Sequence, residues 1–560
     1  MRVARVPAIL VAIGGLAACS EPSQPASPSQ PSYALVASPT CVASPTVIVS
    51  DEPGLTAALS GAHAGDVVAI NGMIAVSSDV TISSSITLTC ATPGSGLLVA
   101  PGATVSSLVR VLASFATVDG LVLDGSGAAS DPYLALNDPG DIDGDGVTGN
   151  ATDVRLTNNM VTCSSGDCAF FFATTNAVVS GNEFQSAGSF TGLQLQGGID
   201  GSRIEHNTIV ASAPSTGADF GGVRVRDGSN VVVADNVVRG PWAHAIAARN
   251  LTGGSIVANR LEPAGSPAAV LLLSVDGVAV DGNTLTGDGT SVAALEVDDS
   301  PGVVLSHNTI SGSWVDAFVL VNTPDARVTD NVVACGSDEC FFGSSAPGTL
   351  VAGNRFISGG SGTGVQLQAG TDGVRIENNE IIAIAPSSAM NFGGVRVRDG
   401  ANVVISGNVV RGPWQNGLAL ADLADSRVEQ NQVDGALRNG IRARSGGSIL
   451  PVSMIHNVIR ANRVTNVGAA GIFLTSACRN EVVWNNVQNS GGNAGVIFDA
   501  PTGANVFVGN GGAVIDNGSF DCSGDGAPDA NIIGGPGSVL HGAPFTPPPN
   551  AADGGAGRLH

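Results

Sequence analysis

The chain has 560 residues and a net charge of −23, and all 24 of its basic residues are arginine. Glycine is abundant, with 76 residues, while aromatic residues make up only 4%. This composition is typical of tight turns between thin aliphatic layers. The acidic balance argues against nucleic acid and against charge-driven docking on an anionic membrane, because both need basic clusters.

The N-terminus has the features of an export signal. Residues 1–5 are basic, and residues 6–18 form an apolar stretch that is too short to span a bilayer. The stretch ends in Leu-Ala-Ala-Cys at residues 16–19, which resembles the lipobox of bacterial lipoproteins. The resemblance implies cleavage before Cys19 and lipid attachment to its thiol. An ordinary cleavage site followed by a chance cysteine is the alternative. We expect a lipid-anchored exported protein at the outer membrane or cell surface.

The segments next to the central region predict a tether, a cap and a tail. Residues 19–45 are rich in proline, serine and alanine, which predicts a tether without a packed core. A short helix is predicted over residues 55–62, where it would cover the open end of the first coils. From residue 538 to residue 560, proline and glycine again predict a flexible tail.

Asparagine recurs about every 24 residues in the central region, each time after a short Val/Ile run. Apolar residues alternate, stop at a turn and resume beyond the asparagine, which predicts stacked strands. Each unit is too short to bury its own face, so stacking must extend one core. We expect the asparagines at sharp left-handed turns, with their amides hydrogen bonded in a ladder. The series is Asn159, Asn182, Asn207, Asn236, Asn259, Asn283, Asn308, Asn331, Asn354, Asn379, Asn408, Asn431, Asn462, Asn486 and Asn510.

This repeat resembles that of right-handed parallel β-helix proteins with the pectate-lyase-like architecture. The resemblance implies an all-β solenoid over residues 46–537, with about 14–18 coils. The asparagine spacing of 23, 25, 29 and 23 residues occurs twice, and FGGVRVRDG at residues 220–228 recurs at 392–400. We interpret this as an internal duplication, with one copy over about 155–325 and the other over about 327–500.

The cysteines predict disulfides. Eight remain once Cys19 is set aside, an even number in an exported chain. Two pairs share the same short spacing, and no histidine lies near either, which makes zinc the less favoured alternative. The predicted pairs are Cys41–Cys90, Cys163–Cys168, Cys335–Cys340 and Cys478–Cys522.

The repeated nonamer supplies candidate ligand-binding residues. Strand alternation places Val223 and Val225 in the core and the adjacent arginines outside, with a turn at Asp227. Arginine pairs beside a long loop and a tryptophan suit an acidic glycan, because guanidinium binds carboxylate and a flat ring meets a sugar face. The alternative is a solvated strand face, with tryptophan capping a corner of the core. The candidates are Arg224, Arg226, Asp227, Trp242, Arg396, Arg398, Asp399 and Trp414.

One polar segment predicts a calcium site. Asp141, Asp143 and Asp145 occupy the first, third and fifth places of a calcium loop, and a glycine takes the sixth. The twelfth place is Thr152 and not the usual glutamate, so a polar insertion without metal is the alternative.

No complete catalytic motif is present, and no catalytic residue can be assigned. The absence of lysine excludes lysine-dependent lyases, and the single Asp-Asp pair, at residues 298–299, falls at a predicted turn. We favour a non-catalytic monomer that binds an extended polysaccharide. The alternatives are a Ca²⁺-assisted polysaccharide lyase or glycoside hydrolase acting on an acidic glycan, and a structural spacer or adhesin.

Overall fold

The computed structural model describes residues 41, 44–126, 131–140, 148–187, 190–215, 217, 220–336, 338–359, 362–446, 454–491, 494–534 and 539–540. The predicted signal peptide, Cys19 and most of the tether lie outside these residues, as does nearly all of the tail. The described part belongs to one compact unit, residues 38–560. It is an all-β parallel solenoid of about 19 turns, which confirms the predicted fold class with slightly more coils than expected.

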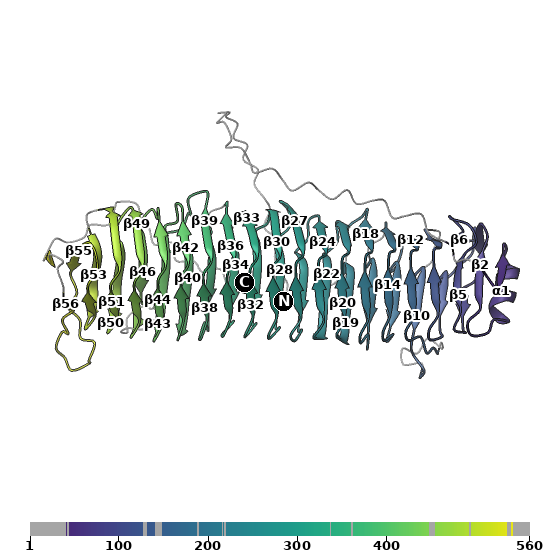
Figure 1. Cartoon of the computed structure of the whole chain (residues 1–560), viewed down its shortest axis with the longest axis horizontal. Coiled ribbons are helices and arrows are strands. Elements are labelled where there is room, and N and C mark those ends of the chain that lie inside the picture. Colours follow the sequence, from purple (N-terminus) through teal and green to yellow (C-terminus); the bar gives the residue numbers. More distant parts are fainter. Residues whose placement is uncertain are drawn as a thin grey trace, which may run out of the picture. The chain divides into compact units, whose positions relative to one another are not determined.

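Each complete coil contributes one strand to each of three parallel sheets, and the coils stack from α1 to β57 (Figure 1). Sheet A contains β1 (Val47–Val49), β2 (Val67–Ile70), β5 (Thr87–Cys90), β8 (Thr117–Asp119), β11 (Arg155–Thr157), β14 (Val178–Ser180), β17 (Arg203–Glu205), β20 (Val232–Ala234), β23 (Ser255–Val257), β26 (Ala279–Asp281), β29 (Val304–Ser306), β32 (Arg327–Thr329), β35 (Leu350–Ala352), β38 (Arg375–Glu377), β41 (Val404–Ser406), β44 (Arg427–Glu429), β48 (Val458–Arg460), β51 (Glu481–Val483), β54 (Val506–Val508) and β56 (Ile532–Gly534). Sheet B contains β3 (Met73–Val76), β6 (Gly96–Val99), β9 (Val122–Gly125), β12 (Met160–Cys163), β15 (Glu183–Ser186), β18 (Thr208–Ala211), β21 (Val237–Gly240), β24 (Arg260–Pro263), β27 (Thr284–Asp288), β30 (Thr309–Ser313), β33 (Val332–Cys335), β36 (Arg355–Ser358), β39 (Glu380–Ala383), β42 (Val409–Arg411), β45 (Gln432–Asp434), β49 (Arg463–Val467) and β52 (Asn486–Ser490). Sheet C contains β4 (Val80–Ile82), β7 (Val109–Val111), β10 (Tyr133–Leu136), β13 (Ala169–Phe172), β16 (Leu193–Gln196), β19 (Gly221–Ser229), β22 (His244–Thr252), β25 (Ala268–Leu273), β28 (Ala293–Asp298), β31 (Asp316–Val321), β34 (Phe341–Ser344), β37 (Val365–Gln368), β40 (Gly393–Ala401), β43 (Asn416–Ala424), β46 (Asn439–Arg444), β47 (Met454–Ile455), β50 (Ile472–Cys478), β53 (Ala494–Gly503), β55 (Ala513–Asp516) and β57 (Val539–Leu540).

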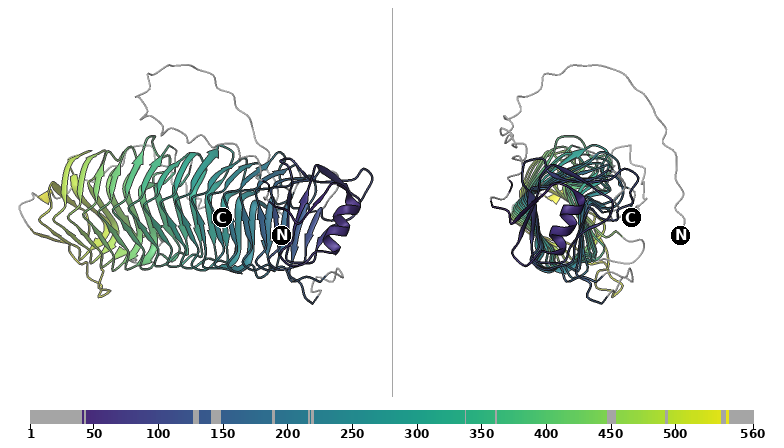
Figure 2. Two further views of the ribbon diagram at one scale, coloured as in Figure 1. Left: turned by 45° about the vertical axis from the view of Figure 1, so that its right-hand side comes forward. Right: turned by 90° about the vertical axis from the view of Figure 1, so that its right-hand side faces the viewer.

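The helix α1 spans Glu52–Ser60 and begins three residues earlier than predicted. Asp51 is its N-cap and accepts a hydrogen bond from the Gly54 N–H at 2.8 Å, and a proline stands in the first turn, so both residues favour this earlier start. Leu55 is buried in the common core. In the end-on view of Figure 2, α1 lies over the interior that the coils enclose.

The core is a continuous aliphatic column, because successive side chains of each strand alternate between inside and outside. In β19, Val223 and Val225 are buried while Arg224 and Arg226 are half-exposed, as predicted. The turn after them is at Asp227, which has a left-handed φ of 61°. A long loop precedes β19 and another precedes β40, also as predicted.

A ladder of buried asparagines lines the corner between sheets A and B. Each Nδ2 donates to the Oδ1 of the asparagine in the next coil, at 2.8–3.0 Å from Asn159 to Asn510. The same Oδ1 also accepts the backbone N–H of the previous asparagine, for example Asn283 N to Asn308 Oδ1 at 3.0 Å. The predicted ladder is therefore confirmed.

Two details of the predicted ladder are wrong. The member after Asn462 is Asn485, because Asn462 donates to the Oδ1 of Asn485, whereas Asn486 is exposed at the start of β52. The left-handed residue is also not the ladder asparagine but the residue before it, such as Asn158 or Trp484. The side chain of the ladder asparagine points inward. The backbone therefore turns at the residue before it, and that residue takes the positive φ.

A second, shorter asparagine ladder lines the corner between sheets C and A in the last coils. Asn457, Asn480, Asn505 and Asn531 are joined by Nδ2–Oδ1 hydrogen bonds of 2.9–3.0 Å. Ser426 precedes them at the same corner and donates its N–H to Asn457 Oδ1 at 2.9 Å. Both ladders satisfy backbone groups that the turns would otherwise leave buried and unpaired.

All four predicted disulfides are present. They are Cys41–Cys90, Cys163–Cys168, Cys335–Cys340 and Cys478–Cys522. Disulfides of this number are typical of proteins that fold in an oxidising compartment, so the chain is an exported protein. Among the described residues, no helix is long and apolar enough to cross a membrane.

The ladder predicts an unequal response to two asparagine substitutions. Asn308→Ala removes an amide that donates to Val280 O at 2.8 Å and to Asn331 Oδ1 at 3.0 Å, and it also removes the acceptor for Asn283. We expect unfolding to require about 2–4 kcal/mol less free energy, because buried partners lose their hydrogen bonds. Thermal and urea unfolding measure the effect.

The matched control is Asn486→Ala, which changes an exposed asparagine of the same repeat. Its effect should stay within about 0.5 kcal/mol. Equal losses of stability in the two variants would contradict the assignment of the ladder.

Candidate functional site

The outer face of sheet C carries two parallel rows of side chains, because its strands stack in register from β13 to β50. Most positions in the rows are apolar or amide side chains. Arginines gather at two places, one in each sequence copy. In chain order, the first row is Phe170, Gln194, Arg224, Ala247, Leu271, Glu296, Val319, Phe342, Gln366, Arg396, Ala419, Arg442 and Phe473.

The site in the first copy has a guanidinium held against an aromatic ring. Arg224 Nη1 donates to Gln194 Oε1 at 2.8 Å, and its guanidinium carbon lies 5.6 Å from the centroid of the Phe220 ring. Phe190 packs against Phe220, with ring centroids 5.5 Å apart. Arg226 lies beside it and pairs with Asp227 at 3.3 Å, so Asp227 neutralises an arginine of the site.

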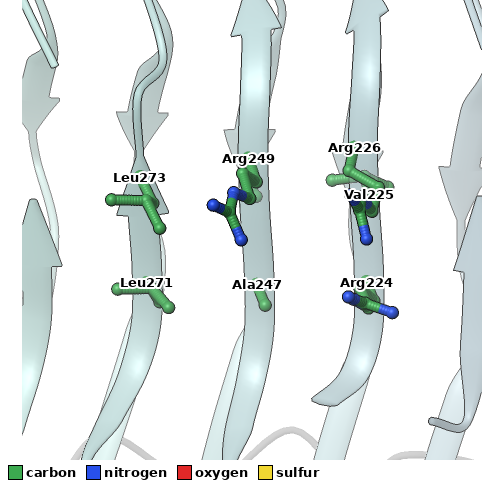
Figure 3. Close-up of a pocket in the computed structure, with 8 residues that line it drawn as sticks. Arg224, Val225, Arg226, Ala247, Arg249, Leu271 and Leu273 are labelled. Carbon is green, nitrogen blue, oxygen red and sulfur yellow. The ribbon is translucent and has the colours of Figure 1, made fainter. Parts of the chain in front are cut away.

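A small pocket opens next to these arginines. Arg224, Arg226 and Arg249 line it together with small and aliphatic residues of β22 and β25 (Figure 3). Ala247 of β22 lies between Arg224 of β19 and Leu271 of β25, and it is in register with both. The first-copy site is therefore cationic on one side and apolar on the other.

The site in the second copy is cationic on both sides, and we call it the four-arginine site. Arg396 and Arg398 extend from β40, and Arg442 and Arg444 extend from β46, two strands away. The strand between them, β43, contributes only alanines to the outer rows, at positions 419 and 421. Strand geometry separates the two pairs by about 10 Å and the members of one pair by about 7 Å.

Two of the four arginines are held by neutral partners. Arg396 Nη1 donates to Gln366 Oε1 at 2.7 Å, and Arg442 Nη1 donates to Asn391 Oδ1 at 2.7 Å. Within the described part of the chain, no hydrogen bond or ion pair engages the guanidinium groups of Arg398 and Arg444. The described residues therefore leave part of the positive charge of the four-arginine site without an ion-paired carboxylate.

The electrostatics of the four-arginine site are unfavourable for the unliganded protein. Burial and the positive charges of Arg398 and Arg444 lower the pKa of Arg396 to about 10. A bound anion would remove this penalty, because opposite charge favours the protonated guanidinium. The arrangement thus favours an anionic ligand, above all one with carboxylates that bind guanidinium in a bidentate manner.

The predicted tryptophan platforms are wrong. Trp242 and Trp414 are fully buried at the corner between sheets B and C, and Trp242 Nε1 donates to the Arg239 carbonyl at 2.9 Å. Neither ring can meet a sugar face. The alternative interpretation, in which tryptophan caps a corner of the core, describes both residues, and Trp314 occupies a third such corner.

Sequence reasoning also missed a set of buried carboxyl groups beside each site. Asp131 accepts the N–H of Asp167 at 2.8 Å, and Asp316 accepts the N–H of Glu339 at 3.0 Å. Asp167 and Glu339 are 172 residues apart, like the arginine pairs, and each precedes a disulfide cysteine. That repeated Asp/Glu–Cys pair was a signal that the sequence offered.

Two of these carboxyl groups, Asp167 and Glu339, resist ionisation. Burial raises the pKa of Asp167 to about 7, and the negative charge of Asp131 adds to the shift. Burial likewise raises the pKa of Glu339 to about 9, with further contributions from Asp338 and Asp316. Carboxylate oxygens of Asp316, Asp338 and Glu339 lie within 4.8 Å of one another, close enough to bind one cation.

The remaining predicted sites lie elsewhere. The three aspartates of the calcium prediction, Asp141, Asp143 and Asp145, fall outside the described residues. Asp399 follows Arg398 at a left-handed turn, with a φ of 60°. Asp299 also has a left-handed φ, of 49°, which agrees with the predicted turn at the Asp-Asp pair.

Sequence comparison identifies the family. The model described as "Right handed beta helix region" matches residues 142–295, 221–381 and 348–520, which together span more than half of the chain. The chain therefore belongs to the right-handed β-helix family, and the predicted resemblance to right-handed parallel β-helix proteins is confirmed. No curated protein matches the sequence.

Several solved structures are similar to this chain at low identity. The periplasmic alginate epimerase AlgG is 12% identical, with 60% of this chain and 77% of that chain covered and a TM-score of 0.35. A mutant of the PL6 family alginate lyase AlyGC is 10% identical, with 88% and 100% covered and a TM-score of 0.34. A mutant tailspike protein of E. coli bacteriophage HK620, in complex with a pentasaccharide, is 14% identical, with 80% and 78% covered and a TM-score of 0.35. At TM-scores this low, none of these likenesses carries an argument about this chain.

The buried glutamate predicts a pH dependence of stability. The folded pKa of Glu339, about 9, lies above its ordinary value of 4.5, so the protonated form stabilises the fold below about pH 4.5. That contribution is lost as the pH rises through 9. Glu339→Gln should therefore raise Tm by about 2–4 °C at alkaline pH and flatten the dependence of Tm on pH.

Calorimetry between mildly acid and alkaline pH checks this expectation. Glu481→Gln is the control, because Glu481 is an exposed residue of β51 and its replacement should leave the profile of the parent unchanged. A Glu339→Gln profile parallel to that of the parent would contradict the burial argument.

Proposed function

We propose that this exported β-helix protein binds an extended acidic polysaccharide along the outer face of sheet C, without chemical change to it. The observation that carries the proposal is the four-arginine site. A chain with a net charge of −23 places four of its 24 arginines around a floor of alanines. Two of those guanidinium groups have no partner among the described residues.

The shape of the face supports a polymer as the ligand. Sheet C is continuous across the coils, and both arginine sites lie on its outer rows, with Gln194 beside one and Gln366 beside the other. Amide side chains can exchange hydrogen bonds with sugar hydroxyls, and arginines bind carboxylates. Phe220 and Phe392 each stack under an arginine of these sites, which fixes the guanidinium planes at the surface.

The proposal also includes the cellular location of the protein. The Leu-Ala-Ala-Cys sequence at residues 16–19 supports a lipid anchor on Cys19, and residues 20–45 would be the tether that carries the solenoid away from the membrane. A monomer held in this way presents sheet C to polysaccharides of the cell surface or the environment.

The proposal predicts that binding depends on the two unpaired arginines. The double variant Arg398→Ala/Arg444→Ala should bind polygalacturonate and alginate at least about tenfold more weakly than the parent, as measured by affinity electrophoresis and calorimetry. Binding by the parent should also weaken as salt rises, because the contacts are between charges.

The matched control is Arg355→Ala. Arg355 is an exposed arginine of sheet B that pairs with Glu380 at 2.9 Å, so its loss changes the net charge without touching sheet C. An equal loss of binding in the control, or full binding by the double variant, would show that the four-arginine site is not the binding site.

One observation favours a second candidate, a cation-assisted lyase or hydrolase of an acidic glycan. Asp316, Asp338 and Glu339 form a group able to bind a cation, and the charge of Glu339 acts on Arg396 of the four-arginine site. In that reading Asp316 and Asp338 would hold Ca²⁺, Arg396 would bind the substrate carboxylate, and the buried carboxyl group of Glu339 would move a proton.

The catalytic candidate predicts products. Incubation with alginate or polygalacturonate and Ca²⁺ should release unsaturated ends or reducing ends, and Glu339→Gln should lower that rate by about 10²-fold or more. The Glu481→Gln variant serves again as the control. If the parent binds these polymers but releases no product, the non-catalytic proposal stands and the catalytic candidate is wrong.

A further inference from the structure

Trp484 is the one tryptophan that the fold does not use in its core. Its side chain is 65% exposed, whereas Trp242, Trp314 and Trp414 are all buried. It lies at the corner between β51 and β52, on the edge where sheets A and B meet. The four-arginine site lies on sheet C, whereas Trp484 lies at the corner between the other two sheets.

The backbone at Trp484 makes its identity unusual. Its φ is +55°, in the left-handed region that large side chains rarely adopt. Other coils place alanine or a polar residue at the same corner, for example Ala461, Asn378 and His307, also at positive φ. A tryptophan here combines backbone strain with an exposed apolar ring, and such combinations persist at sites that bind ligands.

The next coil leaves room for the indole. A Cβ on Gly509, the corner residue that follows Trp484, would lie 2.5 Å from Trp484 Cδ1 and 2.9 Å from Nε1. The pyrrole part of the ring therefore lies directly against the Gly509 backbone. Only glycine allows this approach, so the two coils together hold the ring in one orientation.

Polar side chains suited to sugar hydroxyls follow Trp484 along β52 and lie on the neighbouring strand β49. Asn486 follows two residues later on the same outer side, and Arg463 stands in register with it on the neighbouring strand. Gln488 Nε2 donates to Asn486 Oδ1 at 3.1 Å, which orients the two amides. In the described part of the chain, neither Trp484 Nε1 nor the Arg463 guanidinium has a hydrogen-bond partner.

We propose that Trp484 is the stacking platform of a second saccharide site, one that takes the ring of a neutral pyranose. The indole supplies a rigid apolar face for the C–H groups of the sugar, and Asn486, Gln488 and Arg463 supply hydrogen bonds to its hydroxyls. Two of these three polar side chains are amides, which favours a neutral sugar over an acidic one. This site does not depend on the function proposed for sheet C.

Tryptophan fluorescence reports on this site in the whole chain. Because the other three tryptophans are buried, acrylamide should quench mainly Trp484. We expect cellohexaose, xylohexaose or mannohexaose to lower the quenching constant by about twofold or more at saturation, since a stacked sugar covers the exposed face. Protection by none of the three oligosaccharides would overturn the proposal.

Substitutions separate stacking from a merely structural role. Trp484→Ala should weaken binding of the protective oligosaccharide by about tenfold or more, and Trp484→Tyr should restore part of it. Tm should not fall, because Ala461 occupies the equivalent corner of the preceding coil. Unchanged binding by Trp484→Ala would overturn the proposal even if quenching had changed.

Two control variants test where on the protein the neutral oligosaccharide binds. Phe115→Ala removes another exposed aromatic side chain at a positive φ of 60°, between sheets C and A, and should leave binding unchanged. Arg398→Ala/Arg444→Ala should also keep the neutral oligosaccharide bound while losing acidic polymers. If that double variant loses both ligands, the neutral sugar binds on sheet C and a separate Trp484 site is wrong.

Discussion

The buried asparagine ladder is the constraint on which the functional surface depends. Each amide ties its own coil to the next through side chain and backbone, so no coil can slip by one residue without leaving buried polar groups unpaired. A one-residue slip would turn every side chain of sheet C to its opposite face. The register that keeps Val395 and Val397 in the core thus also keeps Arg396 and Arg398 outside.

A duplicated block in a solenoid returns its side chains to the same face, because each coil begins at the same corner. Arg224 and Arg396 therefore lie in one row on sheet C, separated by intervening coils, and each donates to a glutamine of the preceding coil. The copies differ on the strand two places after each arginine pair. The outward position there is Leu271 in the first copy and Arg442 in the second. This difference makes only the second copy cationic on both sides.

The periodicity in the sequence was enough to predict the solenoid and the inward and outward residues of β19, and the number and spacing of the cysteines were enough to predict the disulfide pairs. It was not enough to choose between Asn485 and Asn486, since adjacent asparagines fit the same pattern and only the turn decides. Trp242 was misassigned because a corner residue faces the core or the solvent according to its backbone angles. Arg442 and Arg444 were missed because their coil has diverged, and only stacking shows that they face the copied arginine pair.

The acidic character of the whole chain and the basic character of one face act at different distances. At physiological ionic strength, charges separated by more than about 8 Å are largely screened. A polyanion approaching this protein is therefore repelled weakly by the net charge of −23, and at contact it meets four guanidinium groups at short range. Partial burial of Arg396 keeps those short contacts strong, because water screens them poorly there. The net negative charge of the chain disfavours non-specific adhesion of acidic polymers, so arginines without a carboxylate partner are the positions that would attract such a polymer.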